Sequence, residues 1–114
     1  MERCLNLKLK ENEKKALFEL KKTLLQKFPD IEIFIYGSKA RGDFIEHSDI
    51  DLLILLNRKV KTLIEEEIIG IVYELELKYG VIFDVLIESK DLWQTPVSEE
   101  MPIHQNIKRE GIRL

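Results

Sequence analysis

The sequence predicts an α+β fold in which a small mixed β-sheet is backed by helices. Long segments repeat apolar residues at intervals of three or four positions, as amphipathic helices do. Three short segments are rich in β-branched and aromatic residues and end at turn residues, as strands do. These segments follow one another in the order helix, strand, strand, helix, strand, helix, which is typical of one sheet with helices packed against it.

Length and composition indicate one globular domain covering residues 1–114. With 45% hydrophobic residues, the chain can form a buried core. The net charge of −3 argues against broad binding to nucleic acid, which normally requires a basic face. The single cysteine, Cys4, fits a reducing compartment. Neither a signal pattern nor an apolar run of about 20 residues is present, so we expect a soluble, cytoplasmic protein without a membrane span.

The first half of the chain predicts one helix and two strands. The helix is expected to begin at a cap at Asn12 and to end at about Phe28, where a proline follows. Residues 31–36 form the first predicted strand, and residues 37–48 a turn with a short helix or loop. Residues 50–56 form a second strand that is apolar on both faces, so both faces are expected to be buried.

The second half predicts a long helix at residues 60–79, a strand at residues 81–88 and a last helix at residues 98–109. Gly80 is expected to cap the long helix, and Gly70 within it is interpreted as a close-packing point. The buried stripe of the long helix is predicted to comprise Leu63, Ile64, Ile68, Ile71, Val72 and Leu75. In the last helix, Pro102 is expected in the first turn, His104 on the surface and Gly111 just beyond the end.

Three aspartates break the apolar pattern of the predicted strands. Asp49 and Asp51 open the second strand two residues apart, so they are expected to point to the same face. Asp84 lies in the middle of the apolar third strand, where an unpaired carboxylate would be costly. Each of these carboxylates therefore requires a compensating partner.

Two kinds of partner for the aspartates remain open. A salt bridge to a basic side chain would suffice for one carboxylate, and Arg41 is the nearest candidate in sequence. For three carboxylates, two of them on one face, a shared divalent cation is the better interpretation. Carboxylate oxygens suit Mg²⁺ or Mn²⁺, and two ions about 3.5–4 Å apart would activate an attacking oxygen and stabilise a leaving one.

The polar segment at residues 37–42, directly after the first strand, predicts a phosphate-binding turn. Gly37 allows a sharp turn and a close approach to a ligand. Ser38 offers a hydroxyl and an N–H, Arg41 can bind phosphate with two N–H groups, and Lys39 can add a positive charge. The alternative is an ordinary strand-to-helix turn, since the spacing is not that of a P-loop. Together with the carboxylate pair that follows, the segment is typical of phosphoryl or nucleotidyl transfer.

The two segments together resemble the signature of the polymerase β-like nucleotidyltransferase superfamily. The run Gly37-Ser38-Lys39-Ala40-Arg41-Gly42 is followed by Ser48-Asp49-Ile50-Asp51-Leu52, and Asp84 is similar to the third carboxylate of the family. The small size resembles the minimal nucleotidyltransferases (MNT), whose antitoxin branch has a tail similar to residues 107–111. The resemblance begins at about Leu17 and implies the polymerase β-like nucleotidyltransferase fold.

The resemblance also implies a role for each residue of the motif. Asp49 and Asp51 would hold two Mg²⁺ ions that bind the triphosphate of ATP, and Asp84 would complete the metal site and help to deprotonate the acceptor. Gly37 and Ser38 would hold the terminal phosphates. Arg41 would support the triphosphate or the aspartates. Attack on the α-phosphorus would then expel pyrophosphate.

The acceptor follows from the resemblance alone. The antitoxin branch pairs with HEPN-domain toxins and adenylylates a tyrosine of the toxin, so a HEPN-type toxin is the expected partner, with a hetero-oligomer possible. Two alternatives stay open. One is a binding module that neutralises its partner by contact without catalysis. The other is a small-molecule nucleotidyltransferase subunit, such as one that modifies aminoglycosides.

Overall fold

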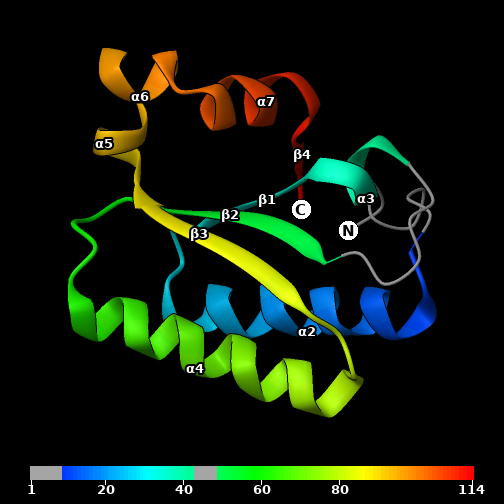
Figure 1. Cartoon of the computed structure of the whole chain (residues 1–114). Helices are drawn as coiled ribbons and strands as arrows, with labels where there is room; N and C mark the ends of the chain where they lie inside the picture. Colours follow the sequence, from blue (N-terminus) through cyan, green and yellow to red (C-terminus); the bar gives the residue numbers. More distant parts are fainter. Residues whose placement is uncertain (1–8, 43–48) are drawn as a thin grey trace.

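The computed structural model describes residues 9–42 and 49–114, and it confirms the predicted α+β class (Figure 1). The described helices are α2 (Glu11–Lys27), α3 (Gly37–Arg41), α4 (Thr62–Tyr79), α5 (Lys90–Trp93), α6 (Pro96–Glu100) and α7 (Pro102–Glu110). The described strands are β1 (Glu32–Tyr36), β2 (Ile50–Leu56), β3 (Phe83–Ser89) and β4 (Ile112–Arg113). Part of the predicted 37–48 turn, including Ser48, lies outside the described residues.

The four described strands form one mixed sheet in the order β3-β2-β1-β4. Strand β2 pairs antiparallel with β1 and parallel with β3, and the parallel pair is connected through helix α4. Strand β4 pairs antiparallel with the outer edge of β1. The central position of β2 explains its sequence, because a strand with neighbours on both edges and layers on both faces is apolar nearly throughout.

Helices α2 and α4 cover one face of the sheet, and α5, α6 and α7 lie over the other (Figure 1). The larger core lies on the α2–α4 side, where Leu17, Leu20 and Leu24 pack against alternate residues of β1 and β2. The smaller cluster, on the other side, consists of Leu53, Leu55 and Ile107 with partly buried neighbours that include Trp93. Within the described residues, no helix is long and apolar enough to cross a membrane.

Several local expectations are confirmed within one or two residues, and others are wrong. Gly80 caps α4 in the left-handed conformation at φ 65°. Leu63, however, is largely exposed rather than part of the buried stripe. A Cβ at Gly70 would meet no atom within 4 Å, so Gly70 is not a close-packing point. Helix α2 begins at Glu11 with Lys10 at the cap, while the Asn12 amide donates to the carbonyl of Tyr79 at 3.0 Å.

The largest difference from the expected fold lies at the C-terminal end. Two helices, α6 and α7, replace the single helix predicted at residues 98–109, and β4 was not predicted. The break lies at Met101, whose backbone is extended (φ −71°, ψ 135°) because the next residue, Pro102, disfavours a helical conformation there. His104 is buried rather than on the surface: its ring stacks on Trp93 at 4.0 Å, and Nδ1 lies 2.9 Å from Oγ of Ser98.

Candidate functional site

The structure places two of the three predicted carboxylates side by side. Asp51 of β2 is in direct register with Asp84 of β3, and Tyr36 of β1 is in register with Asp51. Residues in direct register point to the same face of a sheet, so the side chains of Tyr36, Asp51 and Asp84 are neighbours on three adjacent strands. Asp49 is exposed and lies just before β2, two residues from Asp51. We call Asp49, Asp51 and Asp84 the carboxylate row.

The position of Asp84 differs from the sequence prediction. Strand β3 begins at Phe83, so Asp84 is its second residue and is exposed, whereas the sequence predicted a carboxylate buried in the middle of the strand. The cost of burying an isolated charge therefore does not apply to Asp84. It falls instead on Asp51, which is half-buried on the central strand.

The electrostatics of Asp51 reflect its neighbours. Burial raises the pKa of Asp51, and the negative charges of Asp84 and Asp49 raise it further, while Arg41 lowers it. The same surroundings raise the pKa of Tyr36 to about 12, through burial and the charges of Asp51 and Asp84. The carboxylate row is thus a region of unfavourable negative potential, which a bound cation would relieve.

The carboxylates of the row are oxygen ligands of the kind that Mg²⁺ takes, but they do not form a closed metal site. Within residues 9–42 and 49–114, no three Asp, Glu, His or Cys side chains are grouped closely enough to enclose a metal ion. Mg²⁺ usually takes only one or two carboxylates and completes its shell with water and substrate phosphates. An open row of acidic oxygens at the end of a sheet matches that mode of binding.

Gly37 is required where the chain leaves β1 because a side chain there would collide with the carboxylate row. Its φ is +76°, a conformation that residues with a Cβ rarely adopt. A Cβ at this position would also overlap Oδ2 of Asp51 and lie 3.2 Å from its Cγ. The turn at residues 37–42 and the carboxylate row are therefore in direct contact, as expected for parts of one site.

A carboxylate near the C-terminus of the chain, that of Glu110, contacts both ends of this turn. Glu110, the last residue of α7, accepts the N–H of Gly37 at 3.1 Å, and its two oxygens each lie 3.1 Å from Nη1 of Arg41. Arg41 thus contacts Glu110 and also lies near enough to Asp51 to lower its pKa. The sequence assigned Glu110 no role, because 73 residues separate it from Gly37 and only its place in the tail at residues 107–111 drew attention.

The two remaining polar residues of the turn are buried. Lys39 is buried and pairs with the equally buried Glu13 of α2 at 3.0 Å. This ion pair connects α3 to α2. The sequence predicted that Lys39 adds a positive charge for binding phosphate, and this prediction is wrong because the ammonium group is paired with Glu13. Ser38 is also buried, directly after Gly37.

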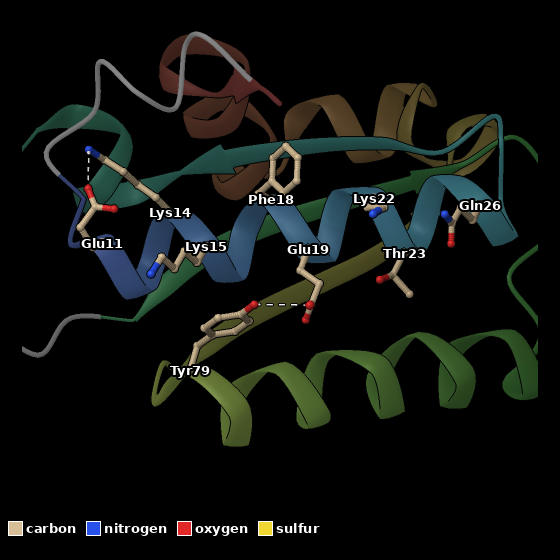
Figure 2. Close-up of a pocket in the computed structure, with 9 residues that line it drawn as sticks. All are labelled: Glu11, Lys14, Lys15, Phe18, Glu19, Lys22, Thr23, Gln26 and Tyr79. Carbon is tan, nitrogen blue, oxygen red and sulfur yellow. Dashed lines mark hydrogen bonds and ion pairs between the residues drawn. The ribbon is translucent and has the colours of Figure 1, made fainter.

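A surface hollow in another part of the described structure does not contain the predicted site residues. A cavity of about 520 Å³ runs along α2 and is lined by Lys14, Lys15, Lys22 and Phe18, with Tyr79 from the end of α4 (Figure 2). Lys14 lies 3.8 Å from Glu11 there, and the Tyr79 hydroxyl donates to Glu19 at 3.3 Å. Helix α2 covers the sheet face opposite the carboxylate row, so this cavity is separate from the candidate site.

Comparison with known sequences gives one family and a close relative. Residues 17–110 match the family described as nucleotidyltransferase domain. A protein of Methanocaldococcus jannaschii named "Putative protein adenylyltransferase MJ0604" is 35% identical over 102 residues, which cover 88% of this chain and 95% of the relative.

Comparison with solved structures supports the same fold. A chain from a toxin–antitoxin crystal structure with AMP-PNP has a TM-score of 0.58 at 18% identity, covering 87% of this chain and 69% of that one. A chain from the complex of a tri-AMPylated Shewanella oneidensis HEPN toxin with its MNT antitoxin has a TM-score of 0.52 at 18% identity, covering 90% and 67%. At these identities the likeness concerns the fold.

Proposed function

This chain belongs to the nucleotidyltransferase family, and we propose that it is a metal-dependent protein adenylyltransferase that acts as the antitoxin of a HEPN-type toxin. The observation that carries the catalytic part is the register of Asp51 with Asp84 beside the turn at Gly37. A negatively charged row and a phosphate-binding turn in contact are what transfer of a nucleotide from a triphosphate needs.

In this proposal Asp49, Asp51 and Asp84 hold two Mg²⁺ ions, or Mn²⁺, together with the triphosphate of ATP. The bound ions supply charge neutralisation at the phosphates and at the attacking and leaving oxygens. Gly37 shapes the turn that brings Ser38 and Arg41 toward the terminal phosphates. In this structure the Gly37 N–H donates to Glu110, and the same carboxylate holds the Arg41 guanidinium.

The reaction exchanges one phosphorus–oxygen bond for another. The acceptor oxygen forms a bond to the α-phosphorus while the bond between that phosphorus and the bridging oxygen of the β-phosphate breaks. Pyrophosphate leaves, and the proton of the acceptor hydroxyl passes to Asp84. The exposed position of Asp84 at the start of β3 suits this role, because an incoming hydroxyl can reach it.

The acceptor is proposed to be a tyrosine of the partner toxin. Two relationships support this choice: the 35% identical relative is named a protein adenylyltransferase, and chains of similar fold occur in toxin–antitoxin complexes, one with an AMPylated HEPN toxin. A protein acceptor brings its own binding surface. A domain of this size therefore does not need a second domain to hold the acceptor.

The proposal is tested by co-expressing the chain with the protein encoded beside it and measuring the intact mass of that neighbour. Wild-type chain with ATP and Mg²⁺ is expected to add one or more adenylyl units, located on tyrosine by fragmentation. The matched control is the double variant Asp49→Asn, Asp51→Asn. Equal masses with wild type and control would refute catalysis, and neutralisation of the neighbour by the inactive variant would point to the contact-only module instead.

A further inference from the structure

Glu110 stands out among the charged groups because it connects the C-terminal end of the chain to the candidate nucleotide site. Its carboxylate accepts the Gly37 N–H and lies 3.1 Å from Nη1 of Arg41 through both oxygens. The Glu110 side chain is only 14% exposed, whereas that of Arg41 is 46% exposed. The carboxylate is thus enclosed by protein, and the guanidinium that it holds remains accessible to a ligand.

Glu110 is held in place from both sides along the chain. Before it, Ile107 is buried in the smaller hydrophobic cluster. After it, the Gly111 N–H donates to the Ile107 carbonyl at 2.7 Å, and a Cβ at Gly111 would overlap that carbonyl oxygen. Strand β4 then pairs with β1, whose last residue directly precedes Gly37. The same strand therefore carries the turn at one end and fixes the tail that bears Glu110.

This arrangement indicates that Glu110 positions Arg41 and is more than a partner in an ordinary surface ion pair. An arginine side chain is flexible, so a ligand that binds it must restrict its rotamers, and a carboxylate that restricts them in advance lowers this cost. A Glu110 carboxylate fixed by α7 and β4 can hold Arg41 before any nucleotide arrives. The other possibility is that Glu110 occupies the place of a phosphate and competes with it.

We propose that Glu110 is a positioning residue of the nucleotide site: it holds the Arg41 guanidinium and the Gly37 turn in the arrangement that binds the triphosphate. The proposal rests on the proposed function, because it takes Arg41 to be a phosphate ligand. The site is otherwise built from the turn at residues 37–42 and the carboxylate row. The proposal adds Glu110, which lies on α7, 61 residues after Asp49.

The test measures Mg·ATP binding to the full chain by isothermal titration calorimetry, which requires no acceptor. Glu110→Gln keeps an oxygen for the Gly37 N–H but removes the charge that holds Arg41. Its affinity for Mg·ATP is expected to fall about tenfold, the size of coupling found within one hydrogen-bond network. A matched control is Glu19→Gln: the Glu19 side chain is 32% exposed and lies 2.8 Å from Nζ of Lys78, which is 58% exposed, and this variant should bind Mg·ATP as wild type does.

A double-mutant cycle separates positioning from a structural effect. If Glu110 acts through Arg41, then adding Glu110→Gln to Arg41→Ala should cause little further loss of affinity. Additive losses would overturn the proposal, as would unchanged or tighter binding by Glu110→Gln, since tighter binding is the signature of a carboxylate that competes with phosphate. If wild type itself binds no Mg·ATP, the proposed function fails and this inference fails with it.

Discussion

The two faces of the sheet differ in what their side chains do, although they share the same strands. On the face under α2 and α4, alternate residues of β2 such as Leu52 and Ile54 are completely buried in the larger core. On the other face, Leu53 and Leu55 belong to a smaller cluster, and toward the start of β2 the pattern changes to Asp51. One strand therefore contributes to the core on one side and, at one end of the other side, to the candidate site.

The two faces also differ in their contribution to the stability of the fold. Apolar burial stabilises the first face at about 25 cal/mol for each Å² removed from water. The carboxylate row does the opposite, because burial and neighbouring negative charges raise the pKa of Asp51 and so disfavour its ionised form. Changes on the two faces should consequently separate stability from activity.

The largest expected effect is loss of transfer in Asp51→Asn or Asp84→Asn. Removing a group that stabilises charge in the transition state costs about 100-fold or more in rate. Labelled-nucleotide transfer to the partner protein measures the loss, and circular dichroism should show a native fold. Activity within a few fold of wild type in either variant would exclude that aspartate from the site.

On the core face, Leu20→Ala should destabilise the fold by about 3 kcal/mol, because it removes buried methyl groups and leaves a cavity. Urea denaturation measures the free energy of unfolding. The control is Leu25→Ala on the same helix, where the side chain is exposed and the change should cost less than about 0.5 kcal/mol. Equal losses in the two variants would contradict the assignment of the core.

Two glycines with positive φ, Gly37 and Gly42, test whether the contact with Asp51 matters. Gly37→Ala introduces both a strained φ and a collision with Asp51, so stability should fall by roughly 1–3 kcal/mol and nucleotide transfer should fall with it. Gly42→Ala has a similar φ, +78°, but no atom within 4 Å of the added Cβ, and should lose stability alone. Loss of transfer in both variants to the same degree would mean that the contact with Asp51 is not important.

The smallest effect is expected at Gly70, which lies in α4 with open space around it. Gly70→Ala should stabilise the protein by up to about 1 kcal/mol through helix propensity, with transfer unchanged. Thermal unfolding checks the sign. A destabilised variant would indicate that α4 packs more tightly at this position than the structure shows.

Local patterns predicted the parts of the fold that depend on local interactions. Periodicity located α2, β1 and β2 to within one or two residues, and Gly80 located the end of α4. Aspartates are unusual in or beside apolar strands, and this contrast predicted the carboxylate row. The family resemblance then assigned the roles of these residues.

The features that the sequence did not predict depend on long-range contacts. Strand β4 has only two residues, and it forms because β1 offers an open edge. Lys39 was expected to face a phosphate, but Glu13, 26 residues earlier in the chain, provides a buried partner. The break before Pro102 is an exception, because the restriction on the residue preceding proline could have predicted it.

The most direct test of this account compares the thermal stability of wild type and Asp51→Asn with and without Mg·ATP. A raised pKa in the folded state means that stability falls as pH rises through that pKa, so near pH 7 Asp51→Asn should melt higher than wild type in EDTA. Saturating Mg·ATP should reverse the order, because only wild type keeps all three proposed metal ligands. An Asp51→Asn variant that melts lower in EDTA, or that gains as much from Mg·ATP as wild type does, would contradict the account.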